Sequence, residues 1–437
     1  MSSYLAHLPL AIHLTAIQLR NNIFSSKEIL DLYKKQKLPL TQYKYYDTNL
    51  SQAINVTIEY LDPPSRQLLQ ELSVFGNNYF SIESIRGFDQ TNIFAIKNQI
   101  EQLLQRCLIQ AYPEDKFKLH PVIALYCTQN FSIDTKLLER IVHYYIKLIS
   151  DGISYLNKQP SGIDKELNCI LHILDTAIQN SLYTSAIALW ERISIYLWTT
   201  GRWEVLDKYG DRIVSVCKMI NDHKSAALLL IRERSWIYYW RGNVETAEEK
   251  ALEGLSLAQQ LEDEYLIAFA EQRLGVFYIT KGSLNRAAQL LESSFQILLR
   301  LKKTSHLIDG NTYFGHLYTN KGQYSEAIEY YKKSLELAEQ ENDYKAQAIS
   351  YTYLSRCFYE LKEYSLCSEN LEKSLKMNSF IGSKIGIAFY YIGKAKLQLA
   401  LKETASAKDL LDKARKLCQE LELNNSLQEI ELLESNL

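Results

Sequence analysis

The sequence contains little glycine and little proline. Of its 437 residues, 16 are Gly and 7 are Pro. Folds built from β-sheets and folds with glycine-rich nucleotide loops need many such residues, because sharp reversals and positive φ angles favour them. The prolines also stop at Pro160, so none occurs from Ser161 to Leu437. The composition therefore predicts a predominantly all-α chain made of two differently built regions.

Cysteine motifs, long apolar runs and an excess of one charge are also absent. The seven cysteines are scattered, without a CxxC pair, which argues against a disulfide framework and against zinc binding. No apolar run reaches the roughly 18 residues of a membrane span, and the apolar segment from Tyr4 to Ile17 lacks the basic start of a signal peptide. The net charge of -2 provides no overall electrostatic attraction of the chain to nucleic acid or to an anionic membrane. We expect a cytoplasmic protein without a metal site or a membrane partner.

Loop-forming residues recur at every fortieth position of the second half, at Gly242, Gly282, Gly322, Lys362 and Lys402. A small residue stands seven positions before each of them, and Ala or Cys stands five positions after. Two helices approach closely only where the facing side chains are small. Each unit is therefore predicted to be a helical hairpin. Because one hairpin cannot bury its own apolar face, the hairpins are expected to stack into a solenoid.

The order of large and small residues in these units resembles the tetratricopeptide repeat. The family pattern W-x2-L-G-x2-Y, followed by A-x3-F, is met by Leu274, Gly275, Tyr278, Ala287 and Leu291. The resemblance implies a right-handed α-solenoid over residues 190–437. The family unit has about 34 residues, so the longer unit here is expected to have longer helices or a longer link. The last copy departs most from the pattern and is expected to cap the solenoid.

In the tetratricopeptide family, the ligand groove is lined by outward residues of the first helix of each repeat. The matching positions here combine aromatic, amide and cationic side chains, which are types that anchor extended peptides. They are Arg232, Trp236, Tyr239, Gln272, Val276, Thr312, His316, Asn320, Thr352, Arg356 and Tyr359. The alternative is an ordinary solvated helix face with no ligand. All five tryptophans lie between residues 190 and 240, where they are either large core residues or aromatic anchors of the groove.

Shorter periodic segments precede the repeats. Apolar spacing predicts helices over residues 65–75, 81–88 and 93–106, strands over 108–111 and 116–119, and a helix from Pro121. Three helices and a small hairpin make a winged helix. Two further helices, over residues 164–180 and 182–200, are predicted as a degenerate leading repeat.

Three runs in this part resemble the winged-helix domain of the NB-ARC class of signal-transduction ATPases, the STAND group: Leu68–Phe75, Ile100–Ile109 and Phe117–Pro121. The segment His7–Ile12 is similar to the G-L-P-L-A-L segment that opens the small helical domain of that family. Many family members end in helical repeats. The two resemblances together divide the chain into a helical remnant (1–40), a winged-helix-like domain (41–135), a helical linker or degenerate repeat (136–189) and tetratricopeptide-like repeats (190–437).

The resemblance to the STAND group also implies two vestigial nucleotide contacts. By motif position, Pro9 corresponds to the proline that lies against adenine, and His120 to the histidine that reaches a phosphate of ADP. From the residues alone, Pro9 is a first-turn helix residue and His120 caps the helix that follows it. No G-x4-G-K-[ST] motif occurs, so the sequence contains no phosphate cradle. We expect no cofactor and no catalytic residue.

The sequence favours a non-enzymatic scaffold or sensor that binds a protein or peptide in the tetratricopeptide groove. One alternative is the effector half of a split STAND-type signalling ATPase, whose partner is a separate P-loop ATPase chain. A winged-helix transcription regulator is the third interpretation. Between residues 41 and 131, seven basic residues stand against nine acidic ones. Phosphate contacts need a basic face, so this balance argues against a nucleic-acid partner.

Overall fold

The computed structural model describes residues 48–89, 92–154 and 161–435, together with residues 16, 25, 27 and 28. Pro9 and the segment around it lie outside the described residues. The chain forms two compact units, one of Met1–Gly152 with Ser161–Trp190 and one of Ile153–Pro160 with Glu191–Leu437. The finer division into four parts stays a prediction. Within the described residues, no helix combines the length and the apolar character that a bilayer span requires.

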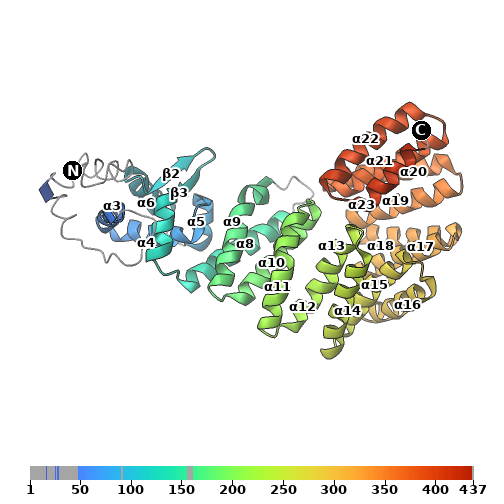
Figure 1. Ribbon diagram of the computed structural model, residues 1–437, viewed down its shortest axis with the longest axis horizontal. Coiled ribbons are helices and arrows are strands. Elements are labelled where there is room, and N and C mark those ends of the chain that lie inside the picture. Colours follow the sequence, from blue (N-terminus) through green and yellow to red (C-terminus); the bar gives the residue numbers. More distant parts are fainter. Residues whose placement is uncertain are drawn as a thin grey trace. The chain divides into compact units, whose positions relative to one another are not determined.

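The first unit contains short helices and one small sheet (Figure 1). Its elements are α3 (Thr48–Glu59), α4 (Pro63–Leu72), the 3-10 turn η2 (Ser73–Phe75), β1 (Tyr79–Ser81), α5 (Ile82–Phe88), α6 (Ile93–Gln105), β2 (Ile109–Tyr112), β3 (Lys116–Leu119), α7 (Pro121–Asn130), α8 (Thr135–Ser154) and α9 (Ser161–Gln179). The strands form an antiparallel sheet in the order β1-β3-β2. The predicted helices and the predicted hairpin of β2 and β3 are confirmed, and they follow one another in the order expected of a winged helix.

One strand of this sheet was not predicted. β1 is three residues long and pairs with β3, with Tyr79 opposite Lys118 and Ser81 opposite Lys116. Three residues are too few to show an alternating pattern in the sequence. The strand forms because it pairs with the edge of β3 that β2 leaves free. The ring of Phe80 on β1 lies 5.5 Å from that of Phe75 and 6.2 Å from that of Phe117, which joins the strand to the core of the unit.

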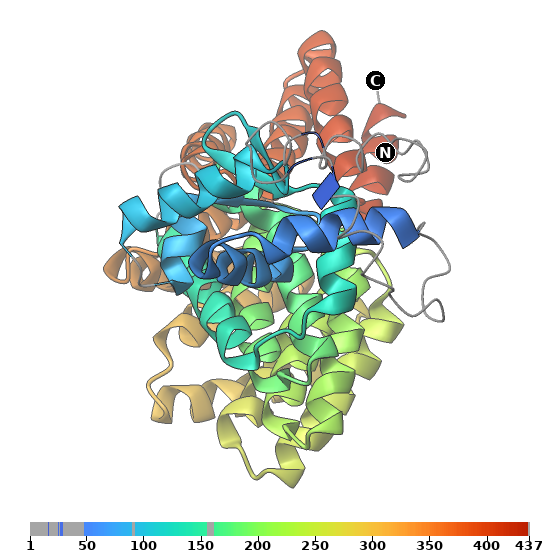
Figure 2. The same cartoon turned by 90° about the vertical axis from the view of Figure 1, so that its left-hand side faces the viewer.

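The second unit continues as a series of helical hairpins (Figure 1, Figure 2). Helix α10 (Tyr183–Thr199) passes into it from the first unit. The elements that follow are α11 (Trp203–Met219), α12 (His223–Leu229), the π-helical turn η3 (Leu230–Arg234), α13 (Ser235–Trp240), α14 (Val244–Gln260), α15 (Glu264–Thr280), α16 (Leu284–Arg300), α17 (Thr304–Asn320), α18 (Tyr324–Gln340), α19 (Tyr344–Glu360), α20 (Tyr364–Ile381), α21 (Lys384–Ala400), α22 (Thr404–Glu420) and α23 (Asn424–Glu434).

Each repeat consists of two helices of nearly equal length and two short links. Between α14 and α22, every helix has 17 residues except α20, which has 18 residues, and nearly all links have three. One residue of each link has a positive φ: Ser181, Gly201, Asn221, Gly242, Glu262, Gly282, Lys302, Gly322, Asn342, Lys362, Gly382, Lys402 and Glu422. The amide after it reaches back over the helix end, as Ser283 N does to Tyr278 O at 2.8 Å. This is the Schellman arrangement, which satisfies the last carbonyl groups of a helix.

The predicted small positions lie where the helices cross. Ala247, Ala287 and Ala327 are fully buried. A Cβ placed on Gly275 would lie 2.7 Å from a Leu291 methyl carbon, which is closer than real side chains approach. A side chain at this position would therefore force the Leu291 side chain to move, so glycine permits the close approach of the paired helices. The predicted helical hairpins and their crossings are confirmed.

A buried arginine joins two hairpins at the start of the second unit. Arg234 is fully buried in η3, and its guanidinium donates two hydrogen bonds of 2.9 Å to Asp211 and one of 3.1 Å to Asp207. Asp207 and Asp211 lie on α11. Arg241 donates to Asp207 as well, at 2.6 Å. This network fixes α13 against α11, and α13 supplies part of the site described below.

The links allow a test of backbone strain. Gly322 has a φ of 74° and nothing within 4 Å of an added Cβ, whereas Lys362 holds the same conformation with a side chain, at a φ of 61°. Lys362→Gly should raise the free energy of unfolding by about 0.5 kcal/mol, because the relief of left-handed strain exceeds the entropy that glycine adds to the unfolded chain. Gly322→Ala should lower it by about 1 kcal/mol.

A matched control is Lys332→Gly, at an exposed position within α18. It should lower stability by about 1 kcal/mol, as glycine does inside a helix. Urea unfolding followed by circular dichroism measures all three changes. If the two Lys→Gly variants shift the midpoint in the same direction, the links do not store strain.

Candidate functional site

The two ends of the second unit contact each other. Arg241, just after α13, donates a hydrogen bond of 2.9 Å to Glu422, which follows α22, although 181 positions separate them. The Asn424 side-chain amide donates to Arg241 O at 3.4 Å. The rings of Trp240 and Phe389 lie 5.8 Å apart, in a tilted arrangement. The two ends of the stacked hairpins therefore meet beside the concave side of the solenoid.

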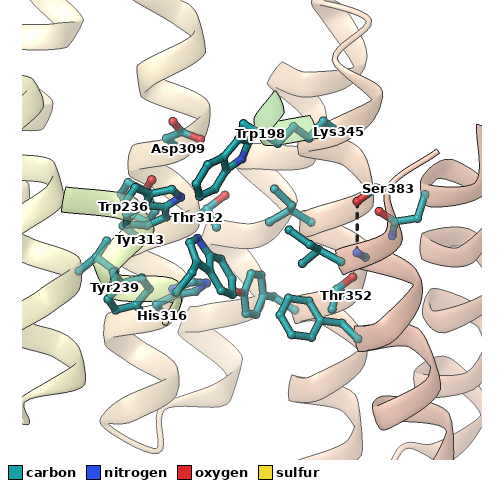
Figure 3. A pocket seen from close by; sticks show the side chains of 18 of the residues that line it. Trp198, Trp236, Tyr239, Asp309, Thr312, Tyr313, His316, Lys345, Thr352 and Ser383 are labelled. Carbon is teal, nitrogen blue, oxygen red and sulfur yellow. Dashed lines mark hydrogen bonds between the residues drawn. The ribbon is translucent and has the colours of Figure 1, made fainter. Parts of the chain in front are cut away.

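A cavity of about 220 Å³ occupies this concave side (Figure 3). Its walls come mainly from the first helix of successive hairpins, α13, α15, α17, α19 and α21, with further residues from α10 and from the end of α20. Aromatic side chains form much of the lining: Trp198, Trp236, Tyr239, Trp240, Tyr313, Tyr353 and Phe389. Both ends of the solenoid contribute, because Trp240 lies on α13 and Phe389 on α21.

The repeat period places equivalent residues around the cavity. Arg273, Tyr313 and Tyr353 all line it and stand one repeat apart. The same holds for Asp309, Ile349 and Phe389, which occupy the position one turn earlier on their helices. Residues four apart share one face of a helix. The first helix of each hairpin therefore turns the same face inward, and the side chain at each position differs from repeat to repeat.

Aromatic contacts fix the wall formed by α13. The rings of Trp236 and Tyr239 stack at 5.0 Å, and that of Trp236 lies 6.1 Å from Phe277. The Tyr239 hydroxyl is 3.2 Å from the Thr280 hydroxyl. The Arg273 guanidinium lies over the Trp236 ring, 4.2 Å from its centroid. These contacts hold the aromatic surface in place before any ligand arrives, which limits the entropy lost on binding.

Charged and titratable groups also line the cavity. Burial raises the pKa of Asp309, and this effect is opposed by the positive charges of Arg273 and Lys345. Burial lowers the pKa of His316 to about 3, and the charge of Arg356 adds to this shift. The His316 ring lies 4.0 Å from that of Tyr353, and its Nε2 has no hydrogen-bond partner. His316 is therefore neutral at pH 7, with an unused polar atom in the wall.

Six of the residues predicted for the groove line this cavity: Trp236, Tyr239, Val276, Thr312, His316 and Thr352. Figure 3 shows five of them labelled around the cavity, together with Trp198, Asp309 and Lys345. The Thr312 and Thr352 hydroxyls lie 2.9 and 2.7 Å from the Ser334 and Ser374 hydroxyls. Their methyl groups and not their hydroxyls are thus the parts left for a ligand.

Two predicted residues lie between helices. Gln272 is buried, and its side-chain amide donates a hydrogen bond of 2.8 Å to His306 O. It joins α15 to the next hairpin, because the side chain points along the helix interface. Arg232 is half-buried within η3, where the π-helical turn shifts the register of the helix face. Neither residue lines the cavity.

Three other predicted residues lie toward the outer ends of their helices. Arg356 is exposed and lies over the rings of Tyr353 and Phe389, at 5.3 and 5.7 Å from their centroids. Asn320 is the exposed last residue of α17, and the ring of Tyr359 lies 6.1 Å from that of Tyr364. Arg356 is thus close to the cavity lining, and the Asn320 side-chain amide donates a hydrogen bond of 2.9 Å to the backbone oxygen of His316, a lining residue. Tyr364, the ring partner of Tyr359, is not among the lining residues. The binding role of Arg356, Asn320 and Tyr359 stays a prediction.

Several lining residues were not predicted, and Arg273, Asp309, Tyr313, Tyr353 and Phe389 are the main ones. The predicted residues follow one line of positions along the first helix of each hairpin. The cavity is also lined by residues from the adjacent line of positions on the same helices. The spacing of Arg273, Tyr313 and Tyr353 by one repeat is the signal that could have identified it. The contributions of Trp198 and Phe389 depend on the closure of the solenoid, which no local pattern reveals.

Of the two predicted nucleotide contacts, only His120 lies within the described residues, and it belongs to the first unit. It is the N-cap of α7, and its Nδ1 accepts a hydrogen bond of 3.3 Å from Val122 N. Burial lowers the pKa of this histidine. The capping role is therefore present, and a phosphate contact stays a prediction. In the ranges that the structure describes, no group of three or more His, Cys, Asp and Glu residues could hold a metal ion.

The buried histidine makes stability depend on pH. In the unfolded chain a histidine takes up a proton near pH 6.5, whereas folded His316 stays neutral down to about pH 3. Acid therefore favours the unfolded state, and the free energy of unfolding falls by up to about 1.4 kcal/mol per pH unit below pH 6.5. When the pH falls from 7 to 5, the free energy of unfolding should decrease in both proteins. We expect this decrease to be about 2 kcal/mol smaller in His316→Phe than in the parent.

Urea unfolding at a series of pH values measures this difference. Asn320→Ala, one turn further along α17 and exposed, serves as the control and should keep the pH slope of the parent. An unchanged slope in His316→Phe would show that His316 is protonated in the folded chain.

The closure of the solenoid predicts a specific change in hydrogen exchange. Arg241→Glu replaces an attraction to Glu422 by a repulsion, so the amides of α23 should exchange about fivefold faster, as expected from the loss of about 1 kcal/mol. Adding Glu422→Arg should slow them again. Arg300→Glu, which breaks the exposed pair of Arg300 with Glu264, is the control and should leave α23 unchanged. If α23 also exchanges at the parent's rate in Arg241→Glu, this contact does not hold the ends together.

Comparison with known proteins identifies the repeats. The tetratricopeptide repeat family model matches residues 309–379, which lie within α17 to α20. A search of curated proteins found no relative. Among solved structures, a STAND protein with a tetratricopeptide repeat sensor from Pyrococcus horikoshii matches with a TM-score of 0.64 and 16% identity, covering 97% of this chain and 62% of that chain. This chain therefore spans less than two thirds of that protein.

Two further solved structures are similar with TM-scores below 0.5. NprR in complex with its cognate peptide NprX has a TM-score of 0.45 and 18% identity, over 62% of this chain and 83% of that chain. A Rap protein complexed with competence and sporulation factor has a TM-score of 0.40 and 15% identity, over 89% of this chain and all of that chain. The family match and the observed hairpins agree: the chain contains tetratricopeptide repeats, within a fold like that of the Pyrococcus STAND protein.

Proposed function

We propose that this protein is a non-enzymatic scaffold or sensor that binds a peptide or a protein segment inside the closed tetratricopeptide solenoid. One observation carries the proposal: a cavity of about 220 Å³ on the concave side, lined by aromatic residues from α10 and α13 at one end of the solenoid and from α21 near the other. Tryptophan, tyrosine and arginine supply most of the binding energy at protein interfaces. All three types line this cavity.

Polar groups in the wall support binding and not only packing. His316 Nε2 and Trp240 Nε1 are buried without hydrogen-bond partners. Such groups destabilise a folded chain by about 1 to 3 kcal/mol each. A ligand that supplied the missing partners would recover part of this free energy. The wall therefore combines an apolar surface with polar groups that would orient a ligand.

The chemistry of the cavity argues against catalysis. A general base works best when its pKa lies near the operating pH, whereas burial lowers the pKa of His316 to about 3. The Thr312 and Thr352 hydroxyls are engaged with serine hydroxyls, so no histidine activates them. These groups can position a ligand, but they do not form a nucleophile and base pair.

Binding of a peptide library to the full chain tests this function. Peptides selected on an array would be titrated by calorimetry against the parent and against Trp236→Ala. We expect about a 30-fold loss of affinity in Trp236→Ala, because tryptophans at the centre of an interface contribute at least about 2 kcal/mol. Tyr330→Ala, which removes a half-buried aromatic side chain from α18 outside the cavity, is the matched control and should bind as the parent does. If no peptide binds, or if both variants lose affinity equally, the concave cavity is not the binding site.

A second candidate is the effector part of a split signalling ATPase, with a P-loop ATPase chain as partner. It is supported by the likeness to the Pyrococcus STAND protein, of which this chain covers 62%, and whose repeats are described as a sensor. In this version the ligand in the solenoid is the signal, and the ATPase partner is the output. Tight binding of ADP by this chain alone, measured by calorimetry, would contradict it.

A further inference from the structure

A buried cation in the cavity wall makes no close ion pair with a carboxylate of the described residues. Arg273 on α15 is 8% exposed, and its Nη1 donates a hydrogen bond of 2.6 Å to the Tyr313 hydroxyl. The guanidinium also lies over the rings of Trp236 and Phe269. Its Nε has no hydrogen-bond partner, and no carboxylate of the described ranges forms an ion pair with it. Buried charges in proteins are normally paired, whereas Arg273 interacts with the charge of Asp309 without forming a close ion pair.

The other charges of the lining do not cancel the positive charge of Arg273. Lys345 on α19 adds a second positive charge, and Asp309 on α17 adds one carboxyl group. Figure 3 shows Asp309 and Lys345 among the side chains around the cavity. The two cations outnumber the carboxyl group whether or not Asp309 is ionised. The net field in the cavity therefore favours an anion.

The space beside Arg273 is small and mostly apolar. Val276, Ile349, Ile385 and Phe389 line it together with the tryptophans. A dry protein cavity of about 150 Å³ holds one benzene molecule, and this cavity measures about 220 Å³. It has room for one aromatic or branched side chain with a carboxyl group.

We propose that the cavity binds one aromatic or branched apolar group that carries a carboxylate. The carboxylate pairs with the Arg273 guanidinium, because charge-assisted hydrogen bonds from arginine to a carboxylate are among the strongest in proteins. The apolar group lies among the tryptophans. Two sources supply this chemistry: the C-terminal residue of a peptide, and a free arylalkanoic acid. The first source rests on the function proposed above, and the second does not.

Asp309 distinguishes an anionic ligand from a cationic one. A ligand carboxylate near Arg273 is repelled by Asp309, so Asp309→Asn should tighten its binding about threefold. An amine bound among the aromatic rings would instead be attracted by Asp309 and by the ring faces. For such a ligand, the same substitution would weaken binding. The direction of the change thus reports the sign of the ligand charge.

Calorimetry on the full chain with four probes tests the proposal. The probes are acetyl-alanyl-leucyl-phenylalanine with a free carboxyl end, the same peptide with a C-terminal amide, 3-phenylpropionate and phenethylamine. We expect the free acid peptide to bind at least tenfold more tightly than its amide, and 3-phenylpropionate to bind more tightly than phenethylamine.

Two substitutions test the assigned cations. Arg273→Gln should weaken binding of the acid peptide at least tenfold and leave the amide peptide unchanged, a difference that a general loss of folding would not produce. Lys345→Gln changes an exposed residue and should weaken the acid peptide about threefold even if Arg273→Gln fails to fold. Arg300→Gln removes an exposed cation from α16 and is the control, with no change expected.

Each outcome has a defined meaning. Equal binding of the acid and amide peptides would overturn this inference and leave the proposed function standing. Binding of 3-phenylpropionate without either peptide would support the inference and contradict peptide binding. Preference for phenethylamine would overturn the inference, and so would the absence of binding of both acids at about 1 mM.

Discussion

The regular spacing of left-handed residues in the links controls the architecture of the second unit. A positive φ recurs once in every link from Ser181 to Glu422, and each such residue ends one helix and directs the chain into the next. Because the helices are nearly equal in length, each pair crosses at the same small positions, such as Gly275 and Gly315. Each first helix therefore turns the same face toward the concave side. The lining of the cavity follows from this constraint.

Contact between the two ends of the unit completes the cavity on that concave face. Arg241 contacts Glu422 and Asn424, and the ring of Trp240 lies near that of Phe389, so residues far apart in sequence line one cavity. Inside it, burial keeps His316 neutral, and Arg273 is buried without a close ion pair. These two features are unfavourable for the folded chain alone. They become favourable when a ligand of suitable charge and shape occupies the cavity, which is the physical reason to assign it a binding role.

The sequence predicted the parts of the fold that depend on local pattern. The hairpins, the crossings at Ala287 and Gly275 and the strands of the winged helix all leave a signal in spacing. The three-residue strand β1 left none, because its formation depends on pairing with β3. Within the site, periodicity located Trp236, Thr312 and His316, whereas the adjacent line of positions on each helix was missed. Trp198 and Phe389 line the cavity because the two ends of the second unit come together. This long-range contact leaves no signal in the spacing of residues along the sequence.

The most direct test of the central claim is tryptophan fluorescence in a chain that carries Trp190→Phe and Trp203→Phe. The remaining three tryptophans, Trp198, Trp236 and Trp240, all line the cavity. Titration with a selected peptide should change their emission along a saturable curve, with the same dissociation constant as calorimetry gives. Binding detected by calorimetry without any change in emission would place the ligand elsewhere and contradict a binding site inside the closed solenoid.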